Sequence, residues 1–407
     1  MKIYLVGGCV RDELLGLSIQ DKDWVVVGAT PAEMLAQGYQ QVGKDFPVFL
    51  HPQTKEEYAL ARTERKIGLG YYNFICNYDP QVTLEEDLLR RDLTINALAK
   101  SADGDIIDPY RGVQDLQQKV LRHVSTAFAE DPVRILRVAR FAARFANLGF
   151  TVAPETMQLM QKMVAAGEVE ALVPERVWQE MVRALQEKNP EVFFLVLHEC
   201  GALARLFPQL DILWGVPQPA KHHPEIDTGV HVMLALQQAV RMTNKPRVRF
   251  AVVCHDLGKG LTPQHEWPSH KGHEERGVKL IQEWCNKYRV PHEFTDLAIK
   301  VSRWHLHAHR AAELRADTIV KLLQGLDAFR KPEILDDYLI ACAADAQGRT
   351  GKETDPYPNA EIIKRAYIAA TGINVSELLE QGFAGKQLGE AILRARIKAV
   401  QQTLRQN

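Results

Sequence analysis

Cysteine is scarce in this chain, and its few positions are scattered. The 407 residues contain six cysteines and no Cys-x-x-Cys pair; they are Cys9, Cys76, Cys200, Cys254, Cys285 and Cys342. Disulfide frameworks and zinc fingers both require closely spaced sets of cysteines. The chain is therefore predicted to be neither a disulfide-stabilised secreted domain nor a zinc-finger protein, and its thiols are expected to be reduced.

Long apolar runs and a strong net charge are missing as well. No uninterrupted apolar stretch approaches the roughly 18 residues of a membrane-spanning helix, and the opening MKIYLVGG is too short to serve as a signal peptide. The net charge is −1, so any surface for nucleic acid must be local. We expect a cytoplasmic protein without a membrane segment, either a monomer or a small homo-oligomer.

The remaining composition is that of a globular protein with several domains. Apolar residues make up 46% and charged residues 25%, and a chain of this length is predicted to form two to four domains. Up to about residue 110 the pattern predicts short strands, at 2–6, 24–27, 46–50, 57–61 and 105–107. From residue 113 helical periodicity prevails, at 131–146, 155–166, 177–186, 192–200, 231–242, 277–288, 317–323, 332–344, 359–370 and 385–404. The predicted fold class is therefore α+β: a small head followed by an all-helical body.

Two segments follow neither period. Residues 62–78 combine two glycines with basic and aromatic side chains, which predicts a mobile loop. Residues 208–224 contain four prolines and one glycine, and form the best candidate linker.

The first 27 residues bring together groups that bind phosphate and metal. Gly7 and Gly8 directly follow the first strand, where backbone N–H groups can approach a polyphosphate, and Arg11 adds a charged fork. Asp21 and Asp23 are two residues apart and point to the same side of an extended segment. Two such carboxylates repel each other unless a cation lies between them, and Mg²⁺ prefers carboxylates together with phosphate oxygens. The group predicts a metal-dependent nucleotidyl-transfer site, against the alternative of a glycine turn beside a solvated acidic loop.

Two further motifs follow, and with them the chain resembles a known family. RRDLTINA begins at Arg90, and EDPVRILR runs from residue 130 to 137. With GGCVRD and the DKD pair, these motifs occur in the order found in class II tRNA nucleotidyltransferases. The resemblance implies a polymerase-β-like head with a mixed β-sheet, and activity as a CCA-adding enzyme that uses tRNA, CTP and ATP.

The resemblance also implies roles for individual residues. Asp21 and Asp23 would bind Mg²⁺, and Gly8, Arg11 and Arg91 would hold the incoming triphosphate. Adjacent arginines cannot face the same way on a helix, so Arg91 is expected to reach the triphosphate while Arg90 pairs with an acid.

The EDPVRILR segment would select the base. Asp131 can accept a hydrogen bond from the amine of cytosine or adenine while Arg134 donates to the ring nitrogen, and uracil and guanine would mismatch both contacts. The alternative is that Asp131 only caps a helix, and both can hold. Arg137 and Arg140 are assigned to the nucleotide, and Arg144 to RNA phosphate or solvent.

Three features distinguish members of the family from one another. Poly(A) polymerases of this type resemble the chain less closely, because they carry a basic Arg-Arg-Phe stretch where this chain has GKDFP at 43–47, and a basic C-terminal extension. Enzymes that add only CC lack the loop that is predicted here at 62–78. These differences favour full CCA addition.

A second set of potential metal ligands lies in the middle of the chain. The set comprises His231, His255, Asp256, His273, His305 and Asp345. The order His…His-Asp…Asp, with LGK after the doublet, resembles the HD phosphohydrolase superfamily, in which a helical bundle binds divalent metals. Mixed imidazole and carboxylate ligands suit Ni²⁺, Mn²⁺ or Co²⁺ better than Mg²⁺. The histidines outside this pattern are interpreted as structural or surface residues: His222, His223, His307 and His309.

The sequence thus predicts four segments and two activities. The segments are a nucleotidyltransferase head at 1–140, a helical RNA-binding region at 141–220, an HD phosphohydrolase domain at 228–347 and a helical tail at 348–407. The predicted function is template-independent addition and repair of the tRNA 3′-terminal CCA, combined with hydrolysis of phosphate monoesters and 2′,3′-cyclic phosphates. Two alternatives remain: a poly(A) polymerase, and a non-catalytic RNA-binding protein with relic motifs.

Overall fold

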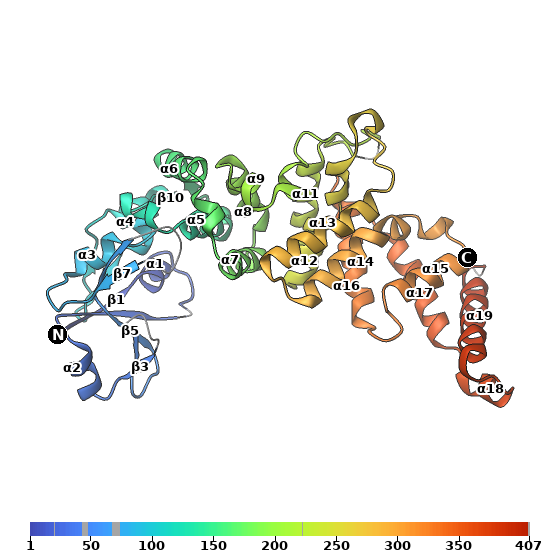
Figure 1. Cartoon of the computed structure of the whole chain (residues 1–407), viewed down its shortest axis with the longest axis horizontal. Helices are drawn as coiled ribbons and strands as arrows, with labels where there is room; N and C mark the ends of the chain where they lie inside the picture. The colour runs from blue at the N-terminus through green and yellow to red at the C-terminus, as the bar shows by residue number, and fades with distance from the viewer. Residues whose placement is uncertain (20, 43–47, 67–73, 222, 406–407) are drawn as a thin grey trace. The chain divides into compact units, whose positions relative to one another are not determined.

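The computed structural model describes residues 1–407 except 20, 43–47, 67–73, 222 and 406–407. The chain divides into two compact units, Met1–Leu206 and Phe207–Asn407. The first unit contains the sheet and the second is helical, so the predicted α+β class is confirmed (Figure 1). None of the described helices is long and apolar enough to cross a membrane.

A seven-stranded mixed sheet organises the head, in the order β3-β4-β5-β2-β1-β8-β9. Only β2 and β5 pair in parallel. The strands are β1 Lys2–Val6, β2 Asp23–Val27, β3 Gln40–Val42, β4 Val48–Leu50, β5 Glu57–Leu60, β8 Ala99–Lys100 and β9 Ile106–Ile107. The predicted strands at 2–6, 24–27, 57–61 and 105–107 are confirmed to within one residue, whereas β3 and β8 were not predicted. Strand β4 covers the described part of the predicted segment at 46–50; the rest of that segment, and the GKDFP stretch, lie outside the described residues.

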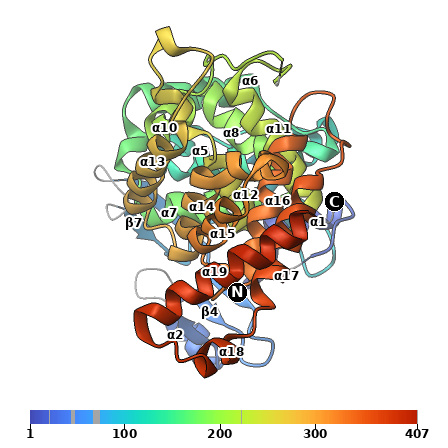
Figure 2. The same cartoon turned by 90° about the vertical axis from the view of Figure 1, so that its right-hand side faces the viewer.

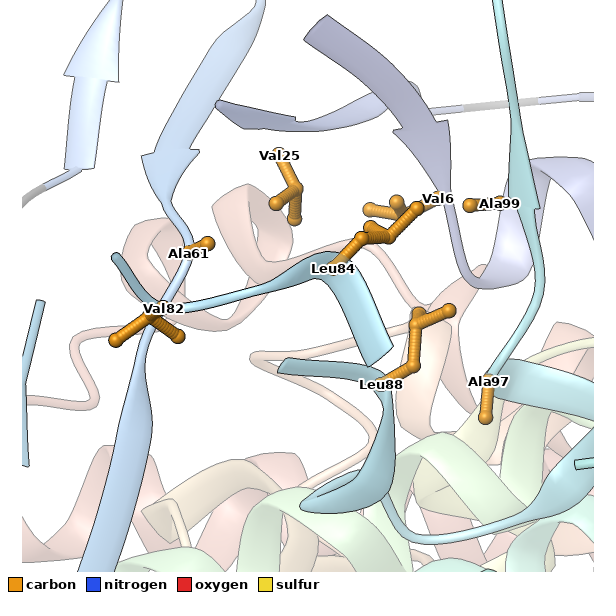
Figure 3. Packing of buried hydrophobic residues seen from close by; sticks show 8 residues of the cluster. All are labelled: Val6, Val25, Ala61, Val82, Leu84, Leu88, Ala97 and Ala99. Carbon is orange, nitrogen blue, oxygen red and sulfur yellow. The ribbon is translucent and has the colours of Figure 1, made fainter. Parts of the chain in front are cut away.

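Side chains alternate along β2 and fill both faces of the sheet. Val25 packs with Val6 of β1 and with Leu84 and Leu88, which belong to helix α3 (Leu84–Leu89) (Figure 3). Val26 points to the other face, against Met34 of helix α2 (Pro31–Ala36). Both helices begin with capping boxes, Thr30 with Glu33 and Thr83 with Glu86, which satisfy their first N–H groups. Strand β2, which begins with Asp23 and lies inside the sheet, is thus packed on both of its faces.

The segment 62–78 was predicted to be a loop, and that interpretation is wrong for its two ends. Strands β6 (Thr63–Lys66) and β7 (Phe74–Asn77) pair in antiparallel fashion as a two-stranded ribbon. The middle of the predicted loop lies outside the described residues. The sequence did not predict this ribbon because its two strands lack the alternation of apolar and polar residues that is typical of a strand.

The remaining helices and strands of the first unit are α1 Gly8–Leu14, α4 Gly112–Gln118, β10 Val120–Leu121, α5 Val133–Phe145, β11 Thr151–Val152, α6 Pro154–Ala165, α7 Pro174–Gln186, α8 Pro190–Glu199 and α9 Ala202–Leu206. Helices α5, α6, α7 and α8 match predicted helical segments, whereas α9 and the short strands β10 and β11 were not predicted. Proline stands at the start of α6, α7 and α8, where its missing N–H costs no hydrogen bond.

The second unit consists of helices. They are α10 Pro208–Asp211, α11 Thr228–Met242, α12 Pro246–Cys254, α13 His273–Tyr288, α14 His292–His309, α15 Ala316–Gly325, α16 Glu333–Gln347, α17 Pro358–Thr371, α18 Val375–Glu380 and α19 Gly385–Leu404. The helices α10, α12, α14 and α18 were not predicted. Helix α19 lies beside α17 and α15 (Figure 2).

The proposed linker at 208–224 is not an extended connection. Its start coincides with the boundary between the units, but Leu210 and Leu213 are fully buried and α10 packs against the turn at Leu257–Leu261. The prolines therefore shape a packed part of the second unit.

Two candidate active sites

One cleft of about 580 Å³ in the head collects almost every residue that the sequence assigned to the nucleotide. Its lining includes Gly8, Arg11, Asp23, Arg91, Asp131, Arg134, Arg137, Arg140 and Arg144. The lining also includes three further arginines, Arg62, Arg90 and Arg176, and two further acids, Glu64 and Asp92. In total, nine arginines and four carboxylates line the cleft. Such an excess of guanidinium groups suits a polyphosphate anion.

The glycine turn after β1 brings the backbone close to this cleft. Gly7 has φ 75°, and a Cβ there would lie 2.7 Å from Nη1 of Arg91, so a side chain would be both strained and in collision. Arg11 is buried, with its guanidinium 5.2 Å from the ring centre of Phe141 and 5.1 Å from that of Phe145. It also donates to the carboxylate of Asp12 at 2.8 Å. The turn and its arginine are thus fixed before any ligand binds.

Asp23 connects the cleft with a neighbouring acidic pocket. It is the first residue of β2 and pairs with Val6 on one side and Glu57 on the other. Asp21 does not line the cleft, but lies with Asp23, Glu56 and Glu57 around the adjacent pocket of about 640 Å³. Loss of hydration raises the pKa of the Asp23 carboxyl; Arg91 opposes the shift and Asp21 adds to it. The pocket also contains Lys22 and Lys55, so binding of Mg²⁺ by Asp21 and Asp23 stays a prediction.

Arg90 pairs with acids as expected, with Asp87 and Glu64, and Arg91 pairs with Asp87 as well, while its contact with a triphosphate stays a prediction. Both line the cleft, and both reach the buried carboxylate of Asp87, Arg90 at 2.9 Å and Arg91 at 3.3 Å. Helix α3 ends at Leu89, so the two side chains are not constrained by helical spacing. One carboxylate therefore holds the pair of guanidinium groups at the edge of the cleft.

The predicted base-selecting residues face the cleft but already have protein partners. Arg134 donates to the carbonyl oxygens of Ala127 at 2.8 Å and Arg90 at 2.5 Å. The carboxylate of Asp131 accepts from the backbone N–H of Val133 at 3.1 Å and is bound by both terminal nitrogens of Arg176, at 3.2 and 2.9 Å. Asp131 thus stabilises the start of α5 as well as facing the cleft. No sequence signal marked Arg176, which lies 45 residues away in α7.

The arginine row of α5 is also paired. Arg137 donates to Asp92 at 2.7 Å, Arg140 to Glu180 at 2.6 Å and Arg144 to Asp12 at 2.9 Å. Although burial opposes it, the charge of Arg137 holds the pKa of the Asp92 carboxyl well below its usual range. These pairs fix the direction of each guanidinium, and they do not by themselves assign any of them to nucleotide or RNA.

The second site is a buried cluster in the helical unit, to which five helices contribute. His231 comes from α11, His255 and Asp256 follow α12, His273 opens α13, His305 lies on α14 and Asp345 on α16. All six predicted ligands are buried. They form two groups whose ligand atoms lie within 4.8 Å of one another: His231, His255 and Asp345, and Asp256, His273 and His305.

The two carboxylates connect these groups. Asp256 Oδ1 lies 3.3 Å from His273 Nε2 and 3.7 Å from His305 Nε2, while its Oδ2 lies 3.1 Å from His255 Nε2. Asp345 Oδ1 lies 3.1 Å from His231 Nε2 and 3.7 Å from His255 Nε2. His255 Nε2 and Asp256 Oδ1 are buried without a hydrogen-bond partner among the described residues. Converging lone-pair atoms with such unsatisfied members fit divalent metal ions.

The electrostatics of the cluster favour an added cation. Burial would raise the pKa of Asp256, but His255 and Lys259 outweigh it and hold this pKa well below the ordinary value. Burial likewise opposes the change at His255, yet Asp256 and Asp345 raise its pKa to about 9. The carboxylates thus stabilise positive charge at the centre of the cluster, which a divalent ion would also supply.

Two histidines that were interpreted as structural or surface residues contact this cluster, and that interpretation stays a prediction for both. His309 Nε2 lies 2.6 Å from Asp345 Oδ2, and His223 Nδ1 lies 3.0 Å from Glu225 Oε1, next to His231. The spacing of four between His305 and His309 in one helix could have revealed the first contact. His307 instead packs against Trp304, and His222 lies outside the described residues.

Three known families match consecutive parts of the chain. The Poly A polymerase head domain matches residues 3–122, and the family described as the probable RNA and SrmB-binding site of polymerase A matches residues 149–213. The HD domain matches residues 228–366. The first match covers the cleft residues between 7 and 96 and the HD match covers the histidine cluster, whereas the cleft residues between 131 and 144 lie outside all three matches.

Relatives and solved structures match nearly the whole chain. A multifunctional CCA protein of Thioalkalivibrio sulfidiphilus is 60% identical over 99% of this chain and 98% of its own length, and one of Alkalilimnicola ehrlichii is 59% identical over 98% and 97%. The structure of a CCA-adding enzyme with ATP has a TM-score of 0.67 at 22% identity, over 98% of this chain and 86% of its own. A Thermotoga maritima CCA-adding enzyme complexed with tRNA has a TM-score of 0.64 at 22% identity, over 100% and 90%. At these identities the solved structures show a shared fold.

Proposed function

This chain belongs to the family of multifunctional CCA proteins, and on that premise we propose that it adds and repairs the 3′-terminal CCA of tRNA from CTP and ATP. In the same chain an HD phosphohydrolase acts on phosphate monoesters and 2′,3′-cyclic phosphates. The observation that carries the proposal is the position of Asp23. It lies at the junction of a carboxylate pocket and a cleft rich in arginine, where the metal and the triphosphate of a nucleotidyl transfer must meet.

In the head, Asp21 and Asp23 would hold Mg²⁺. Mg²⁺ bound there would orient the α-phosphate and neutralise the pyrophosphate that leaves. Gly8, Arg11 and Arg91 bind the triphosphate. The ion pair between Arg91 and Asp87 holds the Arg91 side chain at the cleft before the nucleotide binds. The tRNA 3′-hydroxyl is the nucleophile.

Asp131 and Arg134 select the base. Their contacts with Arg176 and with two backbone carbonyls fix the two side chains in advance, which reduces the ordering cost of binding. Arg137 and Arg140 are assigned to the nucleotide as well, and Arg144 to RNA phosphate or solvent.

In the helical unit, a transition metal such as Ni²⁺, Mn²⁺ or Co²⁺ would be held by His231, His255 and Asp345. A second would be held by Asp256, His273 and His305. A divalent ion at such a site supplies Lewis acidity for water and for the phosphoryl oxygens. Lys259, whose ammonium lies 2.5 Å from Asp256 Oδ2, keeps that carboxylate ionised and oriented. The phosphohydrolase would give a damaged tRNA the free 3′-hydroxyl that the head requires.

The four segments at 1–140, 141–220, 228–347 and 348–407 are part of this proposal. Family matches at 3–122, 149–213 and 228–366 support the order of the first three segments, and the HD match continues beyond residue 347 to residue 366. A cytoplasmic location follows from the proposed substrates, since tRNA, CTP and ATP are used there. The chain would act as a monomer or a small homo-oligomer.

The decisive experiment is incubation of the purified chain with Mg²⁺ and tRNA that lacks CCA, supplying each NTP in turn. We expect two additions with CTP alone, three with CTP and ATP, and none with UTP or GTP. Continued extension by ATP would establish a poly(A) polymerase instead. Absence of any incorporation, with a tRNA that another CCA-adding enzyme extends, would favour the RNA-binding protein with relic motifs.

A further inference from the structure

The four histidines of the buried cluster differ in what holds the ring nitrogen that faces away from the centre. In three of them Nδ1 bonds a backbone carbonyl, His255 that of Val252 at 2.7 Å, His273 that of His270 at 2.9 Å and His305 that of Ser302 at 2.9 Å. Nδ1 of His231 is buried and forms no hydrogen bond among the described residues. The carboxylate oxygen Oε1 of Glu225 nevertheless lies 3.0 Å from it, as a close charge contact.

Glu225 is itself held on both oxygens. Its Oε1 accepts from His223 at 3.0 Å, and its Oε2 accepts the backbone N–H of Thr350 at 3.3 Å. The carboxylate is 2% exposed. Thr350 follows the end of α16, the helix that carries Asp345. Glu225 thus ties the start of α11, where His231 lies, to the segment that follows Asp345.

The charge of this partner matters for the chemistry of His231. An imidazole that donates Nδ1–H keeps Nε2 as a lone pair, and a carboxylate acceptor makes that lone pair more basic than a carbonyl does. Nε2 of His231 points at Asp345 Oδ1, 3.1 Å away. A cation between these two atoms would therefore meet the most strongly polarised imidazole of the cluster.

We propose that Glu225 is a positioning residue of the HD centre. It fixes the tautomer and the ring direction of His231, and so sets the affinity of the His231, His255 and Asp345 group for a transition metal. The inference rests on the proposed metal centre and adds to it a residue that lies outside the ligand set. Glu225 contacts Nδ1 of His231 while Nε2 faces Asp345; with His223 and His231, Glu225 also forms a third group of potential ligand atoms within 4.8 Å of one another.

The test compares two glutamates, each beside a ligand histidine. Glu225→Gln keeps the shape and replaces the charged acceptor by a neutral amide. Glu274→Gln is the matched control: Oε2 of Glu274 lies 3.5 Å from Nδ1 of His273, but that nitrogen already bonds the carbonyl of His270. The full-length chain is stripped of metal, and Ni²⁺ and Co²⁺ binding is measured by competition with a chromophoric chelator.

We expect E225Q to weaken binding at one metal position by roughly 10–100-fold, and E274Q to bind as the wild type does. The visible spectrum of the Co²⁺ form should change in E225Q and not in E274Q. CTP and ATP addition should be unchanged in both variants, which shows that the head is folded, and an unchanged helical circular dichroism signal shows the same for the second unit. His223→Phe, which removes the donor that holds Glu225 Oε1 while keeping a ring, should give a smaller loss of the same kind, and it serves as the second variant if E225Q is unstable.

The outcomes separate the inference from the function on which it rests. If E225Q and H223F bind metal as the wild type does while His255→Ala loses it, the role of Glu225 is wrong and the metal centre stands. If neither His255→Ala nor Asp256→Ala weakens metal binding, the proposed centre itself is wrong. Equal losses in E225Q and E274Q would also overturn the inference, because any nearby negative charge would then suffice.

Discussion

The head cleft and the histidine cluster are both assigned to phosphate chemistry, but they are built from different side chains. The cleft gathers guanidinium groups around about 580 Å³ of open space and places its carboxylates at one edge of a sheet. The cluster buries six imidazole and carboxylate ligands between helices and leaves ligand atoms facing each other. The first recognises a large anionic substrate, and the second concentrates binding strength on small cations.

The difference extends to how each site is stabilised without ligand. In the cleft, arginines are paired with acids such as Asp87, Asp92 and Asp131, so the excess positive charge is fixed in direction. In the cluster, each of the two carboxylates is contacted by one cationic side chain, Asp256 by Lys259 at 2.5 Å and Asp345 by Arg349 at 3.8 Å. Although burial opposes it, the two carboxylates raise the pKa of His255 to about 9. The excess of arginines in the cleft therefore favours an anionic ligand, and the buried carboxylates of the cluster favour a cation.

The largest expected effect separates the two sites from the head side. Asp23→Ala removes the carboxylate shared by both head pockets, so addition of C and of A should fall by at least about a thousandfold, roughly 4 kcal/mol of transition-state stabilisation. Hydrolysis of 2′,3′-cyclic AMP should remain. The control is Asp103→Ala, an exposed acid of the same unit. Addition by the Asp23 variant at more than a thousandth of the wild-type rate would argue against a metal role.

The reverse experiment removes the HD site and tests whether nucleotide addition by the head survives. Asp256→Ala removes the carboxylate that contacts both ligand groups, so hydrolysis should fall by at least about 100-fold, which corresponds to roughly 3 kcal/mol. Addition to tRNA with a free 3′-hydroxyl should be unaffected. A tRNA that ends in 2′,3′-cyclic phosphate should be extended by the wild type with Ni²⁺ present and not by the variant. Extension of that RNA by the variant would place the second activity elsewhere.

A third prediction concerns the role of Asp131 and Arg134 in selecting the base of the NTP. Asp131→Asn with Arg134→Gln reverses or removes the proposed contacts to the base, so preference for CTP and ATP over UTP should fall by about 10–100-fold, or 1–3 kcal/mol. The readout is kcat/KM for each NTP with tRNA lacking CCA. Arg205→Gln, an exposed arginine of the same unit, should change nothing. Unchanged discrimination in the double variant would remove these residues from base selection.

The smallest effect concerns stability and its dependence on pH. The pKa of Asp92 is lower in the folded state than in the unfolded chain, so its contribution to stability is present above about pH 4 and is lost as pH falls. Asp92→Asn should therefore lower the stability of the head by about 1–2 kcal/mol at pH 7, since Arg137 is partly solvated. The gap between the urea midpoints of the two proteins should narrow from pH 5 to pH 3. A constant gap would exclude the charge of Asp92 as its cause.

Much of this molecule can be predicted from local sequence patterns. Strands β1, β2 and β5 follow from short apolar runs bounded by glycine, proline and aspartate, and the positions of α6, α7, α8 and α17 from periodicity with proline at the start. The proximity of Asp21 to Asp23 and of His255 to Asp256 is fixed by covalent neighbourhood. Motif order supplied the family, which the relatives at about 60% identity bear out.

The tertiary structure alone decided which distant groups meet. Arg176 binds Asp131 across 45 positions, Asp87 holds both Arg90 and Arg91, and Glu225 approaches His231 while Thr350 holds it from 125 positions away. Local pattern cannot give these contacts, because each depends on how helices pack and not on spacing along one helix or strand. Sequence determined the chemistry available at each site, and packing decided which of those groups face a ligand and which hold their neighbours in place.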